Sequence, residues 1–156
     1  WKTMHSGTTW KPIFDNQKVY STGCITIDSK KPSTIWLGTG ENVGGRHAGF
    51  GDGVYVSHND GKSWKNMGLE NSEHISKIIV HPENSDIVWV ASQGPLWSKG
   101  GDRGVYKTID GGKSWRRTLG DAAWVGATDM LISYTHLRAH DTVLDFVLRL
   151  LLEKKN

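Results

Sequence analysis

The stretch that decides the fold is Gly104–Trp115, GVYKTIDGGKSW. In it a short β-rich run ends in Thr108, a tight Asp-Gly-Gly turn follows, and Ser114-Trp115 opens the next run. Residues 53–64, GVYVSHNDGKSW, repeat it almost letter for letter, and WKTMHSGTTW at the start of the chain is a degenerate third copy. The last tryptophans of the copies are 54 and 51 residues apart, at Trp10, Trp64 and Trp115. This period indicates a repeat protein.

Each full unit contains four short β-rich runs separated by turn residues. They are a β-branched run (23–28, 75–81), a tryptophan-bearing run (34–39, 86–92), the GVY run, and a run after the Asp-Gly turn. No segment before residue 132 shows sustained helical periodicity. Four antiparallel strands in each repeat favour an all-β fold, a β-propeller whose blades are four-stranded sheets. A β-solenoid ranks second, because its coils are shorter than this period.

The domain organisation predicted from these repeats is an incomplete β-propeller over residues 1–132. Trp1 aligns with Tyr55 and Tyr106 in the middle of a unit, so we expect a fragment with two nearly complete blades plus partial blades. The run 125–132, VGATDMLI, is expected to start a further blade, since it is similar to the earlier first strands.

Residues 133–156 do not follow the repeat. SYTHLRAH, at 133–140, resembles the translation of a transposase-type sequencing adapter, and VLRLLLEKK is similar to its far end. We therefore interpret 133–156 as a non-native, helical, adapter-derived tail. The alternative is a genuine C-terminal amphipathic helix, which the apolar and basic spacing of Leu144–Lys155 also fits.

Composition excludes several classes of function. The tail holds four of the 19 basic and three of the 16 acidic residues, which leaves 15 and 13 and a nearly neutral chain. The basic residues are scattered, so we expect no nucleic-acid partner. No apolar run is long enough for membrane insertion. Cys24 is the only cysteine and no histidine pair has metal-ligand spacing, so neither a metal nor a cofactor is expected.

The motif SHNDGKSW and its relative TIDGGKSW are similar to the Asp-box of bacterial-neuraminidase (BNR) repeats. The Asp-box copies lie at 3–10, 57–64 and 108–115, and His5 replaces the Asp in the first. An Asx side chain accepts hydrogen bonds from amides of its own turn, and the glycine enters a conformation that other residues avoid. We therefore expect a structural role for Ser57, Asn59, Gly61, Ser63 and Trp64, and for Thr108, Asp110, Gly112, Ser114 and Trp115.

The runs GTGENVGGRHAGFGDGVY and HISKIIVHPENSDIVWVASQGPLW, together with the two motif copies, resemble the sortilin/Vps10-like propellers of the glycosyl-hydrolase-type repeat group. The resemblance covers residues 1–132. It implies an extracellular or periplasmic location. It does not imply an activity, because this repeat group includes receptors, assembly factors, sialidases and glucanases.

Strand parity predicts where a site would lie. In a four-stranded antiparallel blade the 1–2 and 3–4 turns share one face, and the 2–3 loops and blade crossovers share the other. The long loops 40–53 and 94–103 therefore lie opposite the Asp-boxes, and binding groups concentrate on such loops. The predicted ligand-binding residues there are Asn42, Arg46, His47, Trp97, Lys99, Asp102 and Arg103.

Two functions remain open. The first is a non-enzymatic propeller that binds a protein or carbohydrate ligand on this loop-rich face. The second is part of a secreted glycoside hydrolase of the sialidase or glucanase type, in which Glu41 and Asp52 supply the paired carboxylates and Trp97 stacks on the sugar. A structural assembly factor is a third reading. We favour binding.

Overall fold

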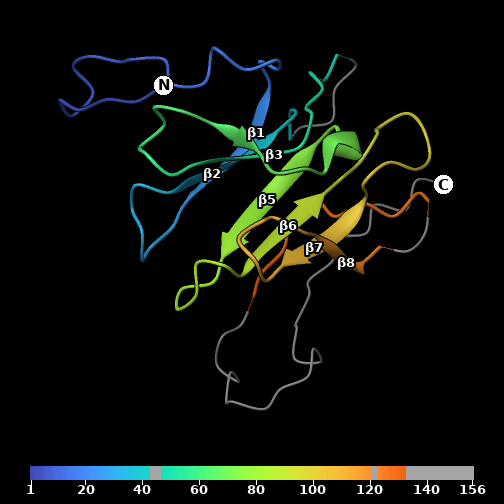
Figure 1. The fold of residues 1–156 in the computed structure, drawn as a ribbon. Coiled ribbons are helices and arrows are strands. Elements are labelled where there is room, and N and C mark those ends of the chain that lie inside the picture. The colour runs from blue at the N-terminus through green and yellow to red at the C-terminus, as the bar shows by residue number, and fades with distance from the viewer. Residues whose placement is uncertain (43–46, 121–122, 133–156) are drawn as a thin grey trace.

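The computed structural model describes residues 1–42, 47–120 and 123–132. These residues form two antiparallel sheets of four strands each, in the orders β1-β2-β3-β4 and β5-β6-β7-β8 (Figure 1). The first sheet contains β1 (Thr22–Ile27), β2 (Ile35–Thr39), β3 (Val54–Ser57) and β4 (Lys65–Asn66). The second contains β5 (Ile75–Val80), β6 (Val88–Ser92), β7 (Gly104–Thr108) and β8 (Arg116–Leu119).

The two sheets have the same register. Thr22 pairs with Thr39 at the start of β1, and Ile75 pairs with Ser92 at the equivalent position of β5. Both pairings are followed by an irregularity, between Thr22 and Cys24 and between Ile75 and Lys77. The sequence repeat is therefore a repeat of one blade, as predicted.

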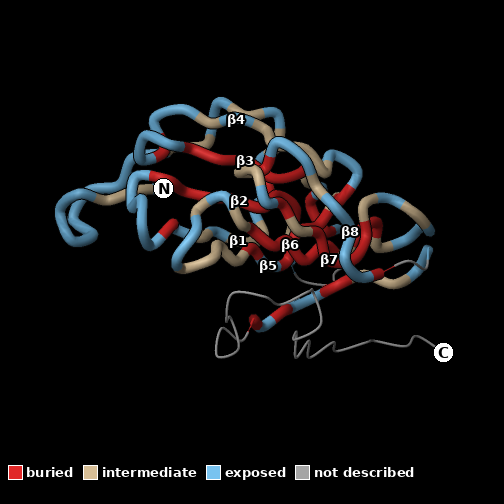
Figure 2. Tube along the Cα trace, turned by 60° about the horizontal axis from the view of Figure 1, so that its bottom comes forward, coloured by how far each residue is buried: buried red, intermediate tan, exposed pale blue. Residues whose placement is uncertain are grey.

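The hydrophobic core lies between the two sheets, where Figure 2 shows buried residues concentrated. Trp36 of β2 is 1 % exposed and packs with Val54 and Val56 of β3 against Ile75 and other residues of the second sheet. All five residues of β2 are buried, and so are all five of β6. Full burial of an aromatic or branched side chain stabilises the fold by about 1.5–3 kcal/mol, so this interface holds the blades together.

The far face of the second sheet is covered by residues 127–132. Ala127 and Met130 are buried against Trp89, Ala91 and Val105. The Ala127 amide also donates a hydrogen bond to the Ser92 carbonyl over 2.8 Å. The run predicted to begin a further blade therefore occupies the position that such a blade would take.

The predicted all-β fold with two four-stranded blades is confirmed. The structure adds one element that the sequence did not predict, the short 3-10 helix η1 (Glu70–Ser72) in the crossover between the sheets. Leu69, just before it, has a φ of 58°, a left-handed conformation that turns the chain into this helix. The predicted helical tail, residues 133–156, lies outside the described residues.

Candidate functional site

The strand order gives the molecule two opposite faces. We call the turn face the side formed by the turns 28–34, 58–64, 81–87 and 109–115. We call the loop face the side formed by the described parts of the loop 40–53 (40–42 and 47–53), the loop 93–103 and the crossover 67–74. One backbone hydrogen bond links the two turns of each blade: the Asp60 amide donates to the Ser33 carbonyl (2.9 Å) in the first, and the Gly111 amide donates to the Asp86 carbonyl (3.0 Å) in the second. This arrangement follows the predicted parity.

On the turn face, the two repeated turns have the same hydrogen bonds. The Ser57 hydroxyl accepts a bond from the Gly61 amide (2.8 Å), as Thr108 does from Gly112 (2.9 Å). In each turn the Asx side chain accepts a hydrogen bond from the backbone amide of the serine before the tryptophan. The Ser63 amide donates to Asn59 (2.9 Å), and the Ser114 amide donates to Asp110 (3.0 Å). These are the bonds that the sequence predicts for an Asx turn.

The glycines of both turns have left-handed φ angles, 81° at Gly61 and 86° at Gly112. A Cβ at Gly61 would lie 2.8 Å from Ile13 Cδ1, and one at Gly112 would lie 2.9 Å from the Trp36 ring. Both conformation and space therefore require glycine.

The degenerate first copy keeps part of this network. The Thr3 hydroxyl accepts a hydrogen bond from the Gly7 amide over 2.9 Å, as its counterparts do. His5 replaces the Asx residue and places Nδ1 3.0 Å from the Thr9 hydroxyl. Lys2 and Lys11 form an antiparallel β-bridge, in which each backbone amide donates to the carbonyl of the other residue over 2.8 Å. The hydroxyl and the glycine thus preserve the turn where the acidic residue is missing.

The tryptophan that ends each turn contacts the preceding unit of the chain. Trp64 Nε1 donates to the Ile13 carbonyl (2.6 Å), and Trp115 Nε1 donates to the Met67 carbonyl (2.7 Å). The Trp115 ring meets Trp36 edge to face with centroids 6.4 Å apart. Each turn is therefore attached to its neighbour, which is a structural role.

Asp110 has the strongest electrostatic signature on this face. Hydrogen bonds from the Ser114 and Thr108 hydroxyls, together with the Ser114 amide, hold the pKa of its carboxyl well below the usual range. A perturbed carboxyl can indicate a catalytic site. Here every cause lies within the turn itself, so the shift reports local structure.

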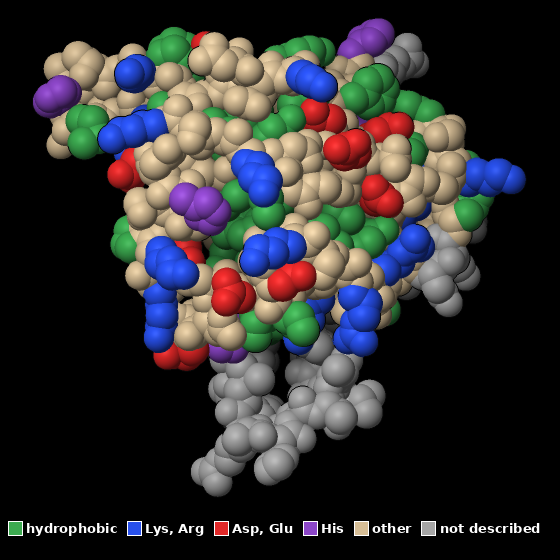
Figure 3. Space-filling view, viewed as in Figure 1, with side chains coloured by type: hydrophobic (Ala, Val, Ile, Leu, Met, Phe, Trp, Pro, Cys, Tyr) green, Lys and Arg blue, Asp and Glu red, His purple; other side chains and the backbone are tan. Residues whose placement is uncertain are grey.

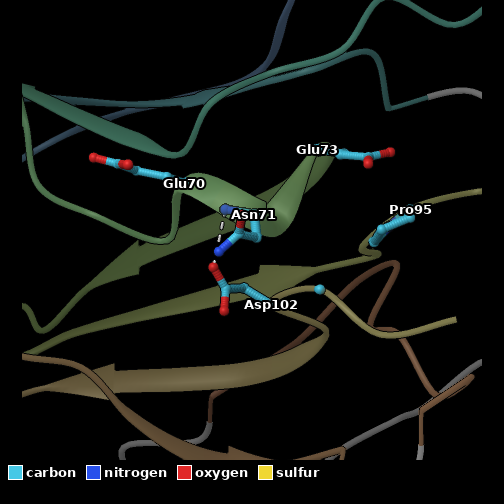
Figure 4. A pocket seen from close by; sticks show the side chains of 6 residues that line it. Glu70, Asn71, Glu73, Pro95 and Asp102 are labelled. Atoms are coloured by element: carbon cyan, nitrogen blue, oxygen red, sulfur yellow. Dashed lines mark hydrogen bonds between the residues drawn. The ribbon is translucent and has the colours of Figure 1, made fainter.

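The loop face contains a hollow of about 500 Å3 between the crossover and the 93–103 loop. Six residues line it: Glu70, Asn71 and Glu73 from the crossover, and Pro95, Gly101 and Asp102 from the loop. In Figure 4 the Asp102 carboxylate points towards Asn71, whereas Glu70 and Glu73 point away from each other. Figure 3 shows acidic side chains gathered over the region of η1. The hollow therefore presents a negative potential to a ligand.

The two sides of the hollow are hydrogen-bonded to each other. The Asn71 amide donates to Asp102 Oδ2, and the Asp102 amide donates to the Asn71 carbonyl, both over 3.0 Å. Asp102, a predicted ligand-binding residue, thus lines the hollow and also holds its walls together.

Arg103 is the residue whose surroundings differ most from the prediction. It is 6 % exposed, and its guanidinium donates to the carbonyls of Gln93 (2.8 Å), Pro95, Ser98 (2.5 Å) and Gly100 (2.9 Å). Burial lowers the pKa of this guanidinium, and the nearby Glu73 carboxylate opposes the shift. An arginine carries five N–H donors, and here they organise the loop rather than face a ligand.

Asn42 and Asp52, from the first loop, also make structural bonds. Asn42 donates to the Ser76 carbonyl (3.2 Å) and accepts from Gln93 (2.7 Å), so it links the two blades. Asp52 Oδ2 accepts the Tyr55 hydroxyl over 2.8 Å. Burial raises the pKa of Tyr55, and this bond raises it further.

The other predicted residues are more open. His47, Trp97 and Lys99 are exposed, and Glu41 is half-buried. The Glu41 carbonyl lies 2.9 Å from Nδ1 of the buried His74. Arg46 lies outside the described residues. Of the predicted residues that the structure describes, only Asp102 lines the hollow.

Sequence reasoning missed Glu70 and Glu73. Strand parity places the crossovers on the loop face as well, but the prediction takes binding residues from the long loops alone. The signal was present in the run ENSEH at 70–74, in which two glutamates lie in a crossover between blades.

Within the described ranges, no group of three or more His, Cys, Asp or Glu side chains could hold a metal ion. No helix in this part of the chain is both long enough and apolar enough to cross a membrane. The thiol of Cys24 has its pKa raised to about 11 by burial, which makes it a weak nucleophile.

Comparison with known protein families gives one match. A family model described as Sortilin, neurotensin receptor 3 (Sortilin-Vps10) matches residues 52–148. No curated protein sequence matches the chain. The family match includes the second sheet, the crossover and the 93–103 loop.

Solved structures that are similar to this chain include two GH74 enzymes. A GH74 enzyme of Niastella koreensis has a TM-score of 0.50 and 17 % identity, over 70 % of this chain and 15 % of that one. An ancestral GH74 enzyme has a TM-score of 0.46 and 23 % identity, over 65 % of this chain and 13 % of that one. The first likeness supports the fold, a fragment of a β-propeller. The chain spans only these small shares of the two enzymes.

Proposed function

The chain belongs to the Sortilin-Vps10 family, and we propose that it contributes a ligand-binding surface to a β-propeller. The ligand, a protein segment or a carbohydrate, is held on the loop face. The turn face, with its repeated turns of Asp-box type, serves as scaffold.

The hollow between the crossover and the 93–103 loop is the observation that carries this proposal. Its volume of about 500 Å3 lies within the range of ligand sites. The carboxylates of Glu70, Glu73 and Asp102 give it hydrogen-bond acceptors and negative charge. On the turn face, by contrast, the Asx side chains of the two repeated turns bond to their own turns.

Binding to defined probes tests the proposal. The probes are a fluorescent octalysine peptide, a neutral octapeptide, and cello-, manno-, xylo- and chitohexaose, measured by anisotropy or calorimetry. We expect at least one probe to bind the chain and to be weakened about tenfold in the double variant Glu73→Gln/Asp102→Asn, as for central contacts of an interface.

Glu83→Gln is the matched control, because Glu83 is an exposed glutamate on the turn face, where it pairs with Lys30 over 3.0 Å. Its removal should leave probe binding unchanged. Equal loss in the control and the double variant, or full binding by the double variant, would contradict a site in the hollow.

A glycoside hydrolase is the second candidate, favoured by the three carboxylates that line one hollow. Glycosidases use a pair of carboxyl groups on either side of the scissile bond. Asp52 is the weaker half of the Glu41–Asp52 pair, since its carboxylate accepts the Tyr55 hydroxyl. A panel of p-nitrophenyl glycosides separates the two functions. Turnover that Glu73→Gln or Glu41→Gln abolishes would establish catalysis, and probe binding without turnover would favour recognition.

An extracellular or periplasmic location is the third part of the proposal, and membership of the Sortilin-Vps10 family supports it. Fractionation of the source cells checks it. We expect the protein in the medium, the periplasm or the extracytoplasmic membrane fraction, and recovery only from the cytoplasm would contradict it.

A further inference from the structure

Two exposed tryptophans lie on the loop face beside the hollow. Trp97 is 65 % exposed and lies in the 93–103 loop. Trp124 is 64 % exposed and lies in the segment after β8, which parity places on the same face. Two large aromatic side chains that are mostly exposed on one face give it an apolar surface that a ligand can cover.

A hydrogen bond joins the two chain segments that carry these tryptophans. The Gly100 amide, three residues after Trp97, donates to the carbonyl of Ala123, the neighbour of Trp124, over 2.9 Å. The guanidinium carbon of Arg103 lies 5.7 Å from the centroid of the Trp124 ring. The same guanidinium donates to the Ser98 carbonyl, next to Trp97 (2.5 Å). The buried Arg103 therefore contacts the Trp124 ring and holds the backbone next to Trp97.

Polar acceptors lie on the other side of the same loop. Pro95, Gly101 and Asp102 line the acidic hollow, whereas Gly100 and Arg103 contact the 123–124 segment. The loop thus separates two flat aromatic rings from a group of carboxylates. A ligand that lies across the loop would contact the apolar rings with one part and the hydrogen-bond acceptors with another.

We propose that Trp97 and Trp124 form a carbohydrate-stacking platform, which takes a pyranose ring of a neutral oligosaccharide. The electron-rich face of an indole attracts the polarised C–H groups of a pyranose. Neighbouring carboxylates accept the sugar hydroxyls. An apolar protein patch fits less well, because it would desolvate carboxylates without giving them donors. This inference rests on the proposed binding role of the loop face.

Calorimetry with cello-, manno-, xylo- and chitohexaose tests the platform. We expect at least one hexasaccharide to bind and to quench tryptophan fluorescence. Trp97→Ala and Trp124→Ala should each weaken that binding about tenfold, the usual loss for a central aromatic contact. The aromatic replacements Trp97→Phe and Trp124→Phe should retain part of it.

Trp10→Ala is the matched control. Trp10 is also exposed, at 57 %, but it ends the first repeated turn and lies away from the loop face. Its replacement should leave both affinity and quenching unchanged. Circular dichroism of each variant checks that the fold is retained.

Two results would overturn the platform. One is the absence of binding by every hexasaccharide at millimolar concentration. The other is hexasaccharide binding that survives in both alanine variants. Octalysine binding that Glu73→Gln weakens would, in either case, leave the proposed function intact, so the two failures can be told apart.

Discussion

The repeated turns of this protein are held by the same hydrogen bonds in both blades, whereas the long loops are held by different ones. The turns 57–64 and 108–115 lie 51 residues apart and have the same hydroxyl, Asx and glycine bonds. The loops 40–53 and 93–103 occupy equivalent places but are held differently, by Asn42 bonds to the next blade and by the buried Arg103. The difference shows that a local hydrogen-bond pattern can be copied from blade to blade, while the opposite face varies.

The largest expected effect is a loss of stability, and it should be greater for a tryptophan of the turn face than for one of the loop face. Trp115→Ala removes the edge-to-face contact with Trp36 and the bond to the Met67 carbonyl. We expect it to lower the free energy of unfolding by about 3 kcal/mol, as large aromatic truncations do. Trp97→Ala, at a side chain that is 65 % exposed on the loop face, should lower it by a smaller amount, about 1 kcal/mol. Urea denaturation measures both, and similar losses in the two variants would contradict the comparison.

The next effect concerns the loop that Arg103 organises. Arg103→Ala leaves the buried carbonyls of Gln93 and Pro95 without their charged donor, which should cost about 2 kcal/mol. The exposed Arg116→Ala is the control and should change stability by about 0.5 kcal/mol or less. Limited proteolysis should cut Arg103→Ala within 93–103. Equal stability and cleavage in both variants would show that the guanidinium does not hold this loop.

A smaller and symmetrical effect is expected within the two turns. Ser57→Ala and Thr108→Val each remove a hydroxyl that accepts a glycine amide and donates to the Asx side chain. Each should lower the free energy of unfolding by about 1–2 kcal/mol, by similar amounts. Ser29→Ala, an exposed hydroxyl on the turn face, should have little effect. Clearly unequal losses would show that the turns are not energetically equivalent.

The smallest effect is a pH dependence at the Asx position, which is a carboxyl group in the second turn and an amide in the first. The pKa of Asp110 is lowered in the folded chain, so its hydrogen-bonded carboxylate contributes stability that is fully present above the unfolded pKa, about 4. That contribution is lost as the pH falls further, through the folded pKa. As the pH is lowered from about 5 to about 2, the midpoint temperature of thermal unfolding should therefore decrease less steeply for Asp110→Asn than for the unmodified chain. Asn59 has no titrating group, so Asn59→Ala should leave the slope unchanged.

Sequence reasoning was most successful where a residue acts within its own turn. Asn59 and Asp110 bond to amides four residues away, and such contacts can be read from spacing alone. It was least successful for Arg103 and Glu73. Whether an arginine faces solvent or four carbonyls depends on how the loop folds around it. Glu73 borders the hollow only because the crossover and the 93–103 loop meet.

The sequence by itself determined the all-β repeat, the blade boundaries, the local bonds of the turns and the parity of the two faces, because these depend on residues close in the chain or on strand alternation. Only the tertiary structure decided which groups gather on the loop face. It buried Arg103, joined Asn71 to Asp102 and brought Trp124 beside the 93–103 loop. Asn71 and Asp102 are 31 residues apart in the sequence, and Arg103 and Trp124 are 21 apart, so no local pattern specifies these contacts. The carbonyls around Arg103 are nearer in the chain, but only the path of the folded loop turns them towards the guanidinium.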